Sequence, residues 1–278
     1  MPEISLKKLH ALIPVLLRIS QDAGTAILEV YESDFDVEHK DDKSPLTLAD
    51  RRSHEIIANG LSGLEGMHIP ILSEEGKTLP FEERRGWELF WLVDPLDGTK
   101  EFVKKNGEFT VNIALVQKGR PVLGVIFIPV KGIFYFGAQG LGSFRLAASL
   151  FDASASPDTL VGRAARLPDI DRASRFTVAG SRSHMSPETE TYINGLRKRH
   201  GDVDFVSAGS SLKFCLIAEG KAHVYPRFAP TMEWDTGAGQ AIVEHAGGEV
   251  FEAASGKPLR YNKESLKNPF FVAQKWHG

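Results

Sequence analysis

Cysteine is almost missing from this sequence of 278 residues, which contains only Cys215. A single cysteine excludes an intramolecular disulfide, a zinc ribbon and a CxxC redox pair, and it fits a reducing compartment. An excess of one charge is missing too, because 33 Lys and Arg stand against 36 Asp and Glu and leave a formal charge of -3. No overall positive field therefore attracts nucleic acid or anionic lipid, and any phosphate that the protein handles must be bound by local groups.

The sequence also lacks an unbroken apolar run long enough to span a membrane. Its N-terminal segment spaces apolar residues at helical intervals from Leu6 to Leu28, between polar residues such as Lys7 and Asp22. This pattern predicts an amphipathic helix rather than a signal peptide or a membrane span. Pro14 cannot lie unkinked in a helix interior, so the helix bends there or restarts with Pro14 in its first turn. We expect a cytoplasmic protein; a peripheral contact with the cytoplasmic face of the inner membrane stays open.

Short connections between apolar stretches mark the first half of the chain. Strands are expected at Thr110–Val116, Val122–Ile128 and Ile133–Gly137, with turns of only a few residues between them. A parallel return would need a crossover of about a dozen residues, so these strands are expected to be antiparallel. The same half is expected to contain a hairpin over 34–48, a helix that begins near residue 47, and strands over 69–72 and 89–93.

The second half alternates strands and helices. Strands are expected over 176–179, 203–207, 222–225, 249–251 and 270–273, and helices over 187–199, 211–219 and 236–245. Residues 147–174 are rich in Ala, Ser and Asp and are expected to form a loop-rich connection. The sequence therefore predicts a mixed α+β and α/β protein with two lobes: residues 1–150 with an antiparallel sheet, and a smaller α/β lobe of residues 151–278.

The densest chemical signal follows an apolar strand and reads Asp94-Pro95-Leu96-Asp97-Gly98-Thr99. Two carboxylates so close together at a strand end repel each other unless a hard cation neutralises them. Gly98 lets the backbone approach a ligand, and Thr99 offers a hydroxyl and a backbone N–H at a helix start, which suits an anion. The pattern favours a site where a cation meets a phosphate; the alternative is an ordinary turn, since each residue is a turn former.

Three further acids stand at comparable positions. Glu74 follows the apolar run at 69–72, Asp235 begins a helix rich in small residues, and Asp50 lies near another helix start. A plain N-cap is the alternative for Asp235, and a simple helix-start acid is the alternative for Asp50. Taken together, these acids shift the balance towards a cation site.

These motifs resemble the inositol monophosphatase superfamily of magnesium-dependent, lithium-sensitive phosphatases. The resemblance rests on Asp94-Pro95-Leu96-Asp97-Gly98-Thr99, on Glu74-Glu75 and on Trp234-Asp235-x-Gly-Ala-Gly, and it extends over nearly the whole chain. Lys100-Glu101-Phe102 is similar to the 3'(2'),5'-bisphosphate nucleotidase branch of the bacterial CysQ type, where inositol monophosphatases usually have Thr-Asn-Phe. The stretches 43–50, 181–184, 209–214 and 225–227 are similar to that branch as well. The resemblance implies the layered fold of these sugar phosphatases.

The resemblance also implies a set of metal ligands. Glu74, Asp94 and the carbonyl of Leu96 would hold a first magnesium ion, and Asp94, Asp97 and Asp235 a second. All of these ligands are oxygens, as magnesium requires. A third, weaker magnesium ion is left open.

Catalytic roles are implied in the same way. Glu74 and Thr99 would orient and deprotonate the attacking water, and Asp50 would contribute through a water or the third ion. The backbone N–H groups of Gly98 and Thr99 would hold phosphate oxygens. The metal ligands themselves would border the substrate.

Substrate contacts from the second half are expected at strand-to-helix loops, where N–H groups face outward. The resemblance points to Ser181, His184, Ser210, Lys213 and Arg227. Lys213 or Arg227 would meet a second, distal phosphate. A surface position for His184 and an ion pair for Arg227 are the alternatives.

The expected activity is hydrolysis of the 3'-phosphate of adenosine 3',5'-bisphosphate to AMP and phosphate, which clears a by-product of sulfate activation. The 3'-phosphoadenylyl sulfate is a further candidate substrate. The nearest rival is an inositol or sugar monophosphatase with the same metals, and a rival of another class is an idle protein that binds nucleotides. The sequence leaves monomer and homodimer open.

Overall fold

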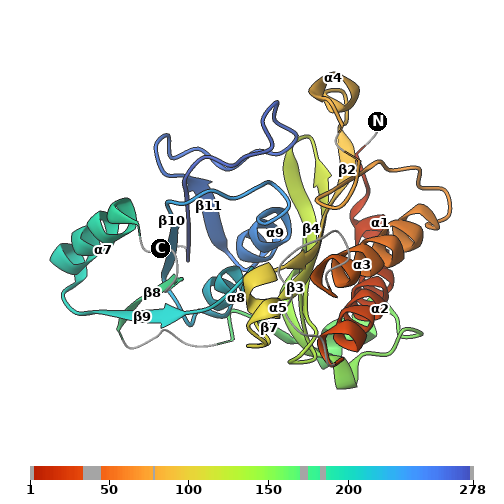
Figure 1. Ribbon diagram of the computed structural model, residues 1–278, viewed down its shortest axis with the longest axis horizontal. Coiled ribbons are helices and arrows are strands. Elements are labelled where there is room, and N and C mark those ends of the chain that lie inside the picture. Colours follow the sequence, from red (N-terminus) through yellow and green to blue (C-terminus); the bar gives the residue numbers. More distant parts are fainter. Residues whose placement is uncertain (1–2, 34–44, 78, 170–174, 182–185, 276–278) are drawn as a thin grey trace.

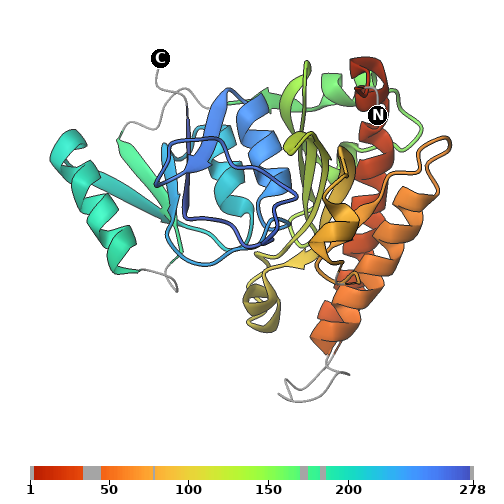
Figure 2. The same ribbon diagram turned by 90° about the horizontal axis from the view of Figure 1, so that it is seen from above.

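Two β-sheets with helices between and outside them organise the structure (Figures 1 and 2). It is a computed structural model that describes residues 3–33, 45–77, 79–169, 175–181 and 186–275. In these residues one sheet has seven strands and the other has five. The expected mixed architecture with two sheet regions is confirmed.

The N-terminal segment forms two consecutive helices, α1 (Leu6–Ala11) and α2 (Ile13–Tyr31). The second helix restarts with Pro14 in its first turn, where the missing N–H costs no hydrogen bond. By length and composition Leu6–Tyr31 is the one helical stretch of the described residues that is suited to crossing a membrane. Its apolar side is nevertheless a core surface, because α2 buries residues such as Leu16 and Ile27 fully.

Helix α3 (Pro45–Ser62) packs beside α2. A hairpin was expected over 34–48, but α3 already includes residues 45–48, so no hairpin extends to Leu48. Residues 34–44 lie outside the described residues. The expectation was wrong at this end because the apolar residues near 48 follow helical rather than alternating spacing.

The first sheet has its strands in chain order. They are β1 (Ile71–Ser73), β2 (Leu89–Asp97), β3 (Thr110–Gln117), β4 (Arg120–Ile128), β5 (Ile133–Ala138), β6 (Gly142–Ala147) and β7 (Ala165–Leu167). All neighbours are antiparallel except β1 and β2, which are parallel. The antiparallel arrangement expected from the short turns is confirmed. The short helices α4 (Phe81–Arg84) and α5 (Thr99–Val103) flank β2.

The first sheet continues into the segment that was expected to be a connection between the lobes. β6 and β7 enclose a 3-10 turn at Ala148–Leu150 and helix α6 (Pro157–Arg163), and β7 pairs with β6. The expected loop over 147–174 is therefore wrong up to Leu167, because a strand of three residues is too short to produce a periodic pattern. The division after residue 150 stays an interpretation.

The second sheet has the order β11-β12-β10-β8-β9. Its strands are β8 (Phe176–Gly180), β9 (Val203–Ser207), β10 (Val224–Arg227), β11 (Gly248–Glu252) and β12 (Phe271–Lys275), and its helices are α7 (Pro187–His200), α8 (Leu212–Glu219) and α9 (Gly237–His245). Strands β8, β9 and β10 run parallel, and β11 and β12 complete the sheet antiparallel. Every element expected in this half is present, with shifted ends.

The layers follow one another from α2 and α3 through the first sheet, the pair α8 and α9 and the second sheet to α7 (Figure 2). Helix α9 contacts β3, β4 and β5 on one side and β11 on the other. This contact is close, because a Cβ on Gly124 of β4 would lie 2.5 Å from the carbonyl oxygen of Ala238. The start of α9 is thereby brought against the first sheet.

Candidate active site

The predicted acids meet where strands of the first sheet approach the start of α9. Glu74 directly follows β1, and its N–H donates to the carbonyl of Val93 in β2 (3.2 Å). The parallel pairing of Ser73 with Val93 thus places Glu74 beside Asp94. Asp235 reaches the same place from the turn before α9, where its Oδ2 accepts the N–H of Met232 (2.8 Å).

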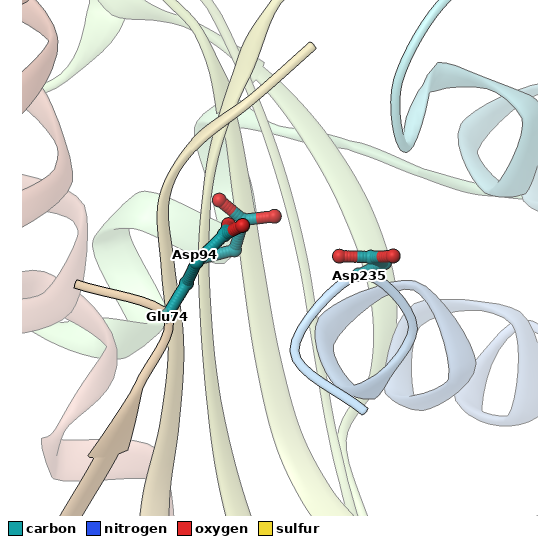
Figure 3. A group of neighbouring side chains, drawn as sticks. All are labelled: Glu74, Asp94 and Asp235. Carbon is teal, nitrogen blue, oxygen red and sulfur yellow. The ribbon is translucent and has the colours of Figure 1, made fainter. Parts of the chain in front are cut away.

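Three of these side chains form a compact cluster (Figure 3). Carboxylate oxygens of Glu74, Asp94 and Asp235 lie within 4.8 Å of one another. Asp94 is almost completely buried, with 1% exposed, Asp235 is half-buried and Glu74 is exposed at the rim. Figure 3 shows Glu74 and Asp94 on one side of the cluster and Asp235 on the other.

Each acid of the cluster has a raised pKa. Burial is the largest cause for all three, and the charge of Asp97 is the second. The pKa of Asp94 lies well above its ordinary value, and those of Glu74 and Asp235 are raised to about 7. In the described part of the chain, none of these acids forms an ion pair with a basic side chain, although the more distant Arg227 opposes the shift of Asp235.

Asp50 approaches the cluster from α3. The hydroxyl of Ser53, one turn further on, donates to the carbonyl of Pro95 (2.7 Å) and fixes this helix against the end of β2. The pKa of Asp50 is raised to about 8, first by burial and then by the charges of Glu75 and Glu74. The structure therefore brings Asp50 near the acids without placing it in the compact cluster.

A β-bulge explains how Asp94 and Asp97 come to face the same side of β2. Residues three apart in a regular strand point to opposite faces. The register shifts between them, because Asp94 pairs with Asn112 while Asp97 pairs with Thr110. One extra residue in β2 turns both carboxylates to the same side. Asp97 lies outside the compact cluster, but its charge raises the pKa of all three members.

The turn after Asp97 combines a close approach with a helix start. Gly98 has φ 100°, in the left-handed region, and a Cβ there would lie 2.0 Å from Oγ of Ser210. Thr99 is exposed and begins α5. Leu96 is buried, and its N–H donates to Oδ1 of Asp94 (3.2 Å).

A pocket adjoins the acid cluster. It lies at the carboxyl ends of β8 and β10, where parallel strands commonly present ligand sites. Its walls include Asp97, Gly98, Glu101, Ser181, Ser210, Lys213, Arg227 and Asp235. The structure thus brings four of the five substrate contacts expected from the second half to one pocket, and His184 lies outside the described residues.

The two basic residues of this pocket are held differently. Lys213 is 4% exposed, and its Nζ donates to the carbonyls of Ala208 (3.0 Å) and Ser210 (2.7 Å). Burial lowers its pKa to about 8. Arg227 donates through Nη2 to the carbonyl of Pro230 (3.2 Å), and its Nε is buried with no hydrogen-bond partner among the described residues.

Three supporting residues were not predicted as site residues. Ser211 and Asn112 donate towards Oδ2 of Asp97. Glu233, fully buried, accepts from the N–H of Asn262 (2.6 Å) and from Nζ of Lys263 (2.6 Å) and so anchors the turn before Asp235. A sequence signal existed only for Ser211, which lies in the family-like stretch 209–214, and for Glu233, which directly precedes the motif that begins at Trp234.

The donor set suits a hard divalent cation. It consists of carboxylates, and a cation among them would replace the missing positive partner of Asp94 and oppose the repulsion that raises these pKa values. A fold with an acid cluster of this kind beside a pocket that contains basic residues defines a metal-dependent phosphate-processing protein.

Comparison with known proteins gives the family. The model of the inositol monophosphatase family matches residues 8–275, and the chain belongs to that family. Curated relatives named "3'(2'),5'-bisphosphate nucleotidase CysQ" from Shigella flexneri and Escherichia coli K12 are each 44% identical over 91% of this chain and 96% of their own length. The crystal structure of CysQ from Bacteroides thetaiotaomicron is 50% identical over 95% of this chain and 97% of its own, with a TM-score of 0.88.

Proposed function

We propose that this protein is a magnesium-dependent phosphohydrolase that converts adenosine 3',5'-bisphosphate to AMP and phosphate. The observation that carries the proposal is the cluster of Glu74, Asp94 and Asp235, whose carboxylates form no ion pair with a basic side chain in the described residues, beside a pocket that contains Lys213 and Arg227. The similarity to curated nucleotidases supports the choice of substrate. The enzyme acts in the cytoplasm, clears a by-product of sulfate activation, and also accepts 3'-phosphoadenylyl sulfate.

The chain offers ligands for two magnesium ions. Glu74, Asp94 and the carbonyl of Leu96 would hold one, Asp94, Asp97 and Asp235 would hold the other, and a third, weaker ion would lie near Asp50. Bound magnesium supplies positive charge that makes water acidic near neutral pH and stabilises the leaving oxygen. The all-oxygen donor set supports magnesium rather than a softer metal.

The protein groups position the reactants. Glu74, at the rim of the cluster, accepts the proton of the attacking water, and the hydroxyl of Thr99 orients that water. The backbone N–H groups of Gly98 and Thr99 hold oxygens of the scissile phosphate at the start of α5. Asp50 contributes a hydrogen-bond acceptor from α3.

The adjoining pocket holds the rest of the nucleotide. Arg227 donates to the second phosphate, which gives its buried Nε a partner. Nζ of Lys213 donates hydrogen bonds to two carbonyls of the loop. Lys213 therefore adds positive charge to the pocket from behind this loop and does not contact the phosphate directly. Ser181, Ser210 and His184 complete the contacts to ribose and base.

The nucleotidase motif contains one residue that reaches this pocket. Of Lys100-Glu101-Phe102, Glu101 lines the pocket, whereas Phe102 is fully buried against Phe109 and Tyr31. Glu101 is therefore the position through which the motif acts on the choice of substrate.

Phosphate release from adenosine 3',5'-bisphosphate and from inositol 1-phosphate, each with magnesium and with EDTA, tests the proposal. We expect fast release from the nucleotide that EDTA abolishes, and slow release from inositol 1-phosphate. Faster hydrolysis of inositol 1-phosphate would keep the metal site and replace the substrate. No release from either would contradict the enzyme itself.

A further inference from the structure

Two consecutive serines hold Asp97 at its backbone and at its side chain. Oγ of Ser210 donates to the carbonyl oxygen of Asp97 (2.8 Å), and Oγ of Ser211 donates to its Oδ2 (2.8 Å). Ser210 has φ 45°, a left-handed conformation that non-glycine residues rarely adopt. The chain thus accepts an unfavourable backbone conformation where both hydroxyls face Asp97.

The same loop is fixed on its other sides. The N–H of Gly209 donates to Glu108 (2.8 Å), and Nζ of Lys213 holds the carbonyls of Ala208 and Ser210. The loop belongs to the second sheet region, whereas Asp97 and Glu108 belong to the first. Ser211 is therefore held rigidly against an acid from the other half of the molecule.

Asn112 of β3 contacts both Ser211 and Asp97. It is 1% exposed, and its Nδ2 donates to Oγ of Ser211 (2.9 Å) and lies 3.4 Å from Oδ2 of Asp97. Its Oδ1 is buried without a hydrogen-bond partner among the described residues, which is unfavourable. The reversed amide would set its oxygen against Oδ2 of Asp97, so the carboxylate determines the orientation.

Ser211 also reaches the ligand on the opposite side of the site. Its Oγ lies 3.2 Å from the carbonyl oxygen of Asp235. Because the hydroxyl has one hydrogen and Oδ2 of Asp97 is nearer, Asp97 is the main acceptor and Asp235 the secondary one. The side chain of Ser211 is only 2% exposed, and it thus contacts two acidic residues, Asp97 and Asp235, from the two halves of the molecule.

We propose that the relay from Asn112 through Ser211 to Asp97 is a positioning device for the cation site. It fixes the carboxylate plane of Asp97 and keeps it in register with Asp235, so that the second oxygen of Asp97 is presented to the cation. The inference rests on the metal site of the proposed function. Outer partners of metal ligands commonly change metal affinity by about 10- to 100-fold.

The test measures Mn²⁺ binding to the metal-free full chain without substrate, with free Mn²⁺ followed by electron paramagnetic resonance. We expect Ser211→Ala to weaken binding about tenfold, and Asn112→Ala to weaken it in the same direction. In an Asp97→Ala background, Ser211→Ala should have no further effect, because the hydroxyl has lost the carboxylate that it orients.

Ser143→Ala is the matched control. Ser143 is fully buried, and its Oγ donates to the carbonyl of Ile242 (2.7 Å), which also links the first sheet to α9 but away from the acids. This variant should lower the melting temperature in EDTA as Ser211→Ala does and leave Mn²⁺ affinity unchanged.

The outcomes separate the two proposals. If the wild type and Ser211→Ala bind Mn²⁺ with equal affinity, the relay is overturned and the proposed function stays intact. A tenfold effect that persists in the Asp97→Ala background would also overturn it, because Ser211 would then act on another group. Absence of Mn²⁺ binding by the wild type would overturn the metal site and the relay together.

Discussion

Asp94 and Glu219 are equally buried, each 1% exposed, yet the charges around them are opposite. Glu219 in α8 accepts from the hydroxyl of Tyr135 (2.9 Å) and forms ion pairs with Arg145 (2.6 Å) and Lys221 (2.9 Å). Burial raises the pKa of Asp94, and the acids that surround it, first among them Asp97, raise it further. One buried acid is compensated by the chain itself, and the other is not.

The contrast separates acids that the chain compensates with basic side chains from acids that the described chain leaves uncompensated. Glu233 repeats the first pattern, with Lys263 and two backbone N–H groups around a fully buried carboxylate. A buried charge without a partner is costly. A fold retains such a cost most readily at a functional site, which supports a cation among Glu74, Asp94 and Asp235.

The largest expected effect is that of Asp94→Asn. Turnover with magnesium should fall more than about a hundredfold, since even outer partners of metal ligands cost about 10- to 100-fold. In EDTA the variant should lose less melting temperature than the wild type as the pH rises, because its amide cannot ionise at a buried position that disfavours charge. Phosphate release and thermal melting measure the two effects. Retained turnover would contradict the role of Asp94.

Glu219→Gln should have the opposite effect on stability. We expect a loss of about 2 kcal/mol, below the ~3–5 kcal/mol of a fully buried pair, because Arg145 keeps its ion pair with Asp169 (2.7 Å). The loss should be the same in EDTA and in magnesium, and turnover per folded molecule should persist. Urea unfolding in both solutions measures it. Higher stability of this variant would remove the contrast with Asp94.

The pH dependence of the metal-free protein should also reflect the acid cluster. The pKa of Asp50 rises from 3.8 to about 8, and that of Asp235 from 3.8 to about 7. For a raised pKa, the contribution to stability is complete below the unfolded value and is lost as pH rises through the folded value. This loss extends from about pH 4 to about pH 8, so in EDTA the melting temperature should fall as the pH rises from 6 to 8.

Magnesium should reverse this trend, because it binds the deprotonated acids. The rise in melting temperature on adding magnesium should be larger at pH 8 than at pH 6, by a few degrees. Asp94→Asn serves as the control. It should reduce both the fall of the melting temperature with pH in EDTA and the rise of the magnesium effect with pH. A magnesium effect that is greater at pH 6 would argue against binding at these carboxylates.

An exposed ion pair provides the smallest effect. Arg85 and Glu82 lie 2.9 Å apart, with side chains 64% and 71% exposed. Arg85→Ala should change the free energy of unfolding by less than about 1 kcal/mol, because exposed pairs are screened by water. Urea unfolding of Arg85→Ala and Glu219→Gln, measured side by side, compares the two losses in free energy of unfolding. An equal loss in both variants would mean that burial does not set the value of these pairs.

Part of the site could be predicted because its information is local. Asp94, Asp97, Gly98 and Thr99 lie within one short motif, and Glu74 is recognisable by its place after an apolar strand. The alternation of strands and helices in the second half also follows from local patterns, as for α7 (Pro187–His200).

The remainder depends on contacts between distant parts of the chain. The bulge that aligns Asp94 with Asp97 appears only in the pairing of β2 with β3. Asn112 looks like an ordinary strand residue until the fold brings Ser211 to it. Besides Lys221 nearby, the partners of Glu219 are Tyr135 of β5 and Arg145 of β6. These two come from distant strands, so the sequence around residue 219 does not reveal that this acid is fully compensated.

Crystals grown with Mn²⁺ test the central claim most directly, since anomalous scattering locates the ion independently of activity. The account predicts Mn²⁺ in contact with carboxylate oxygens of Glu74, Asp94 and Asp235, and its loss in Asp94→Asn. Well-occupied Mn²⁺ elsewhere on the protein, with none at these three acids, would contradict it.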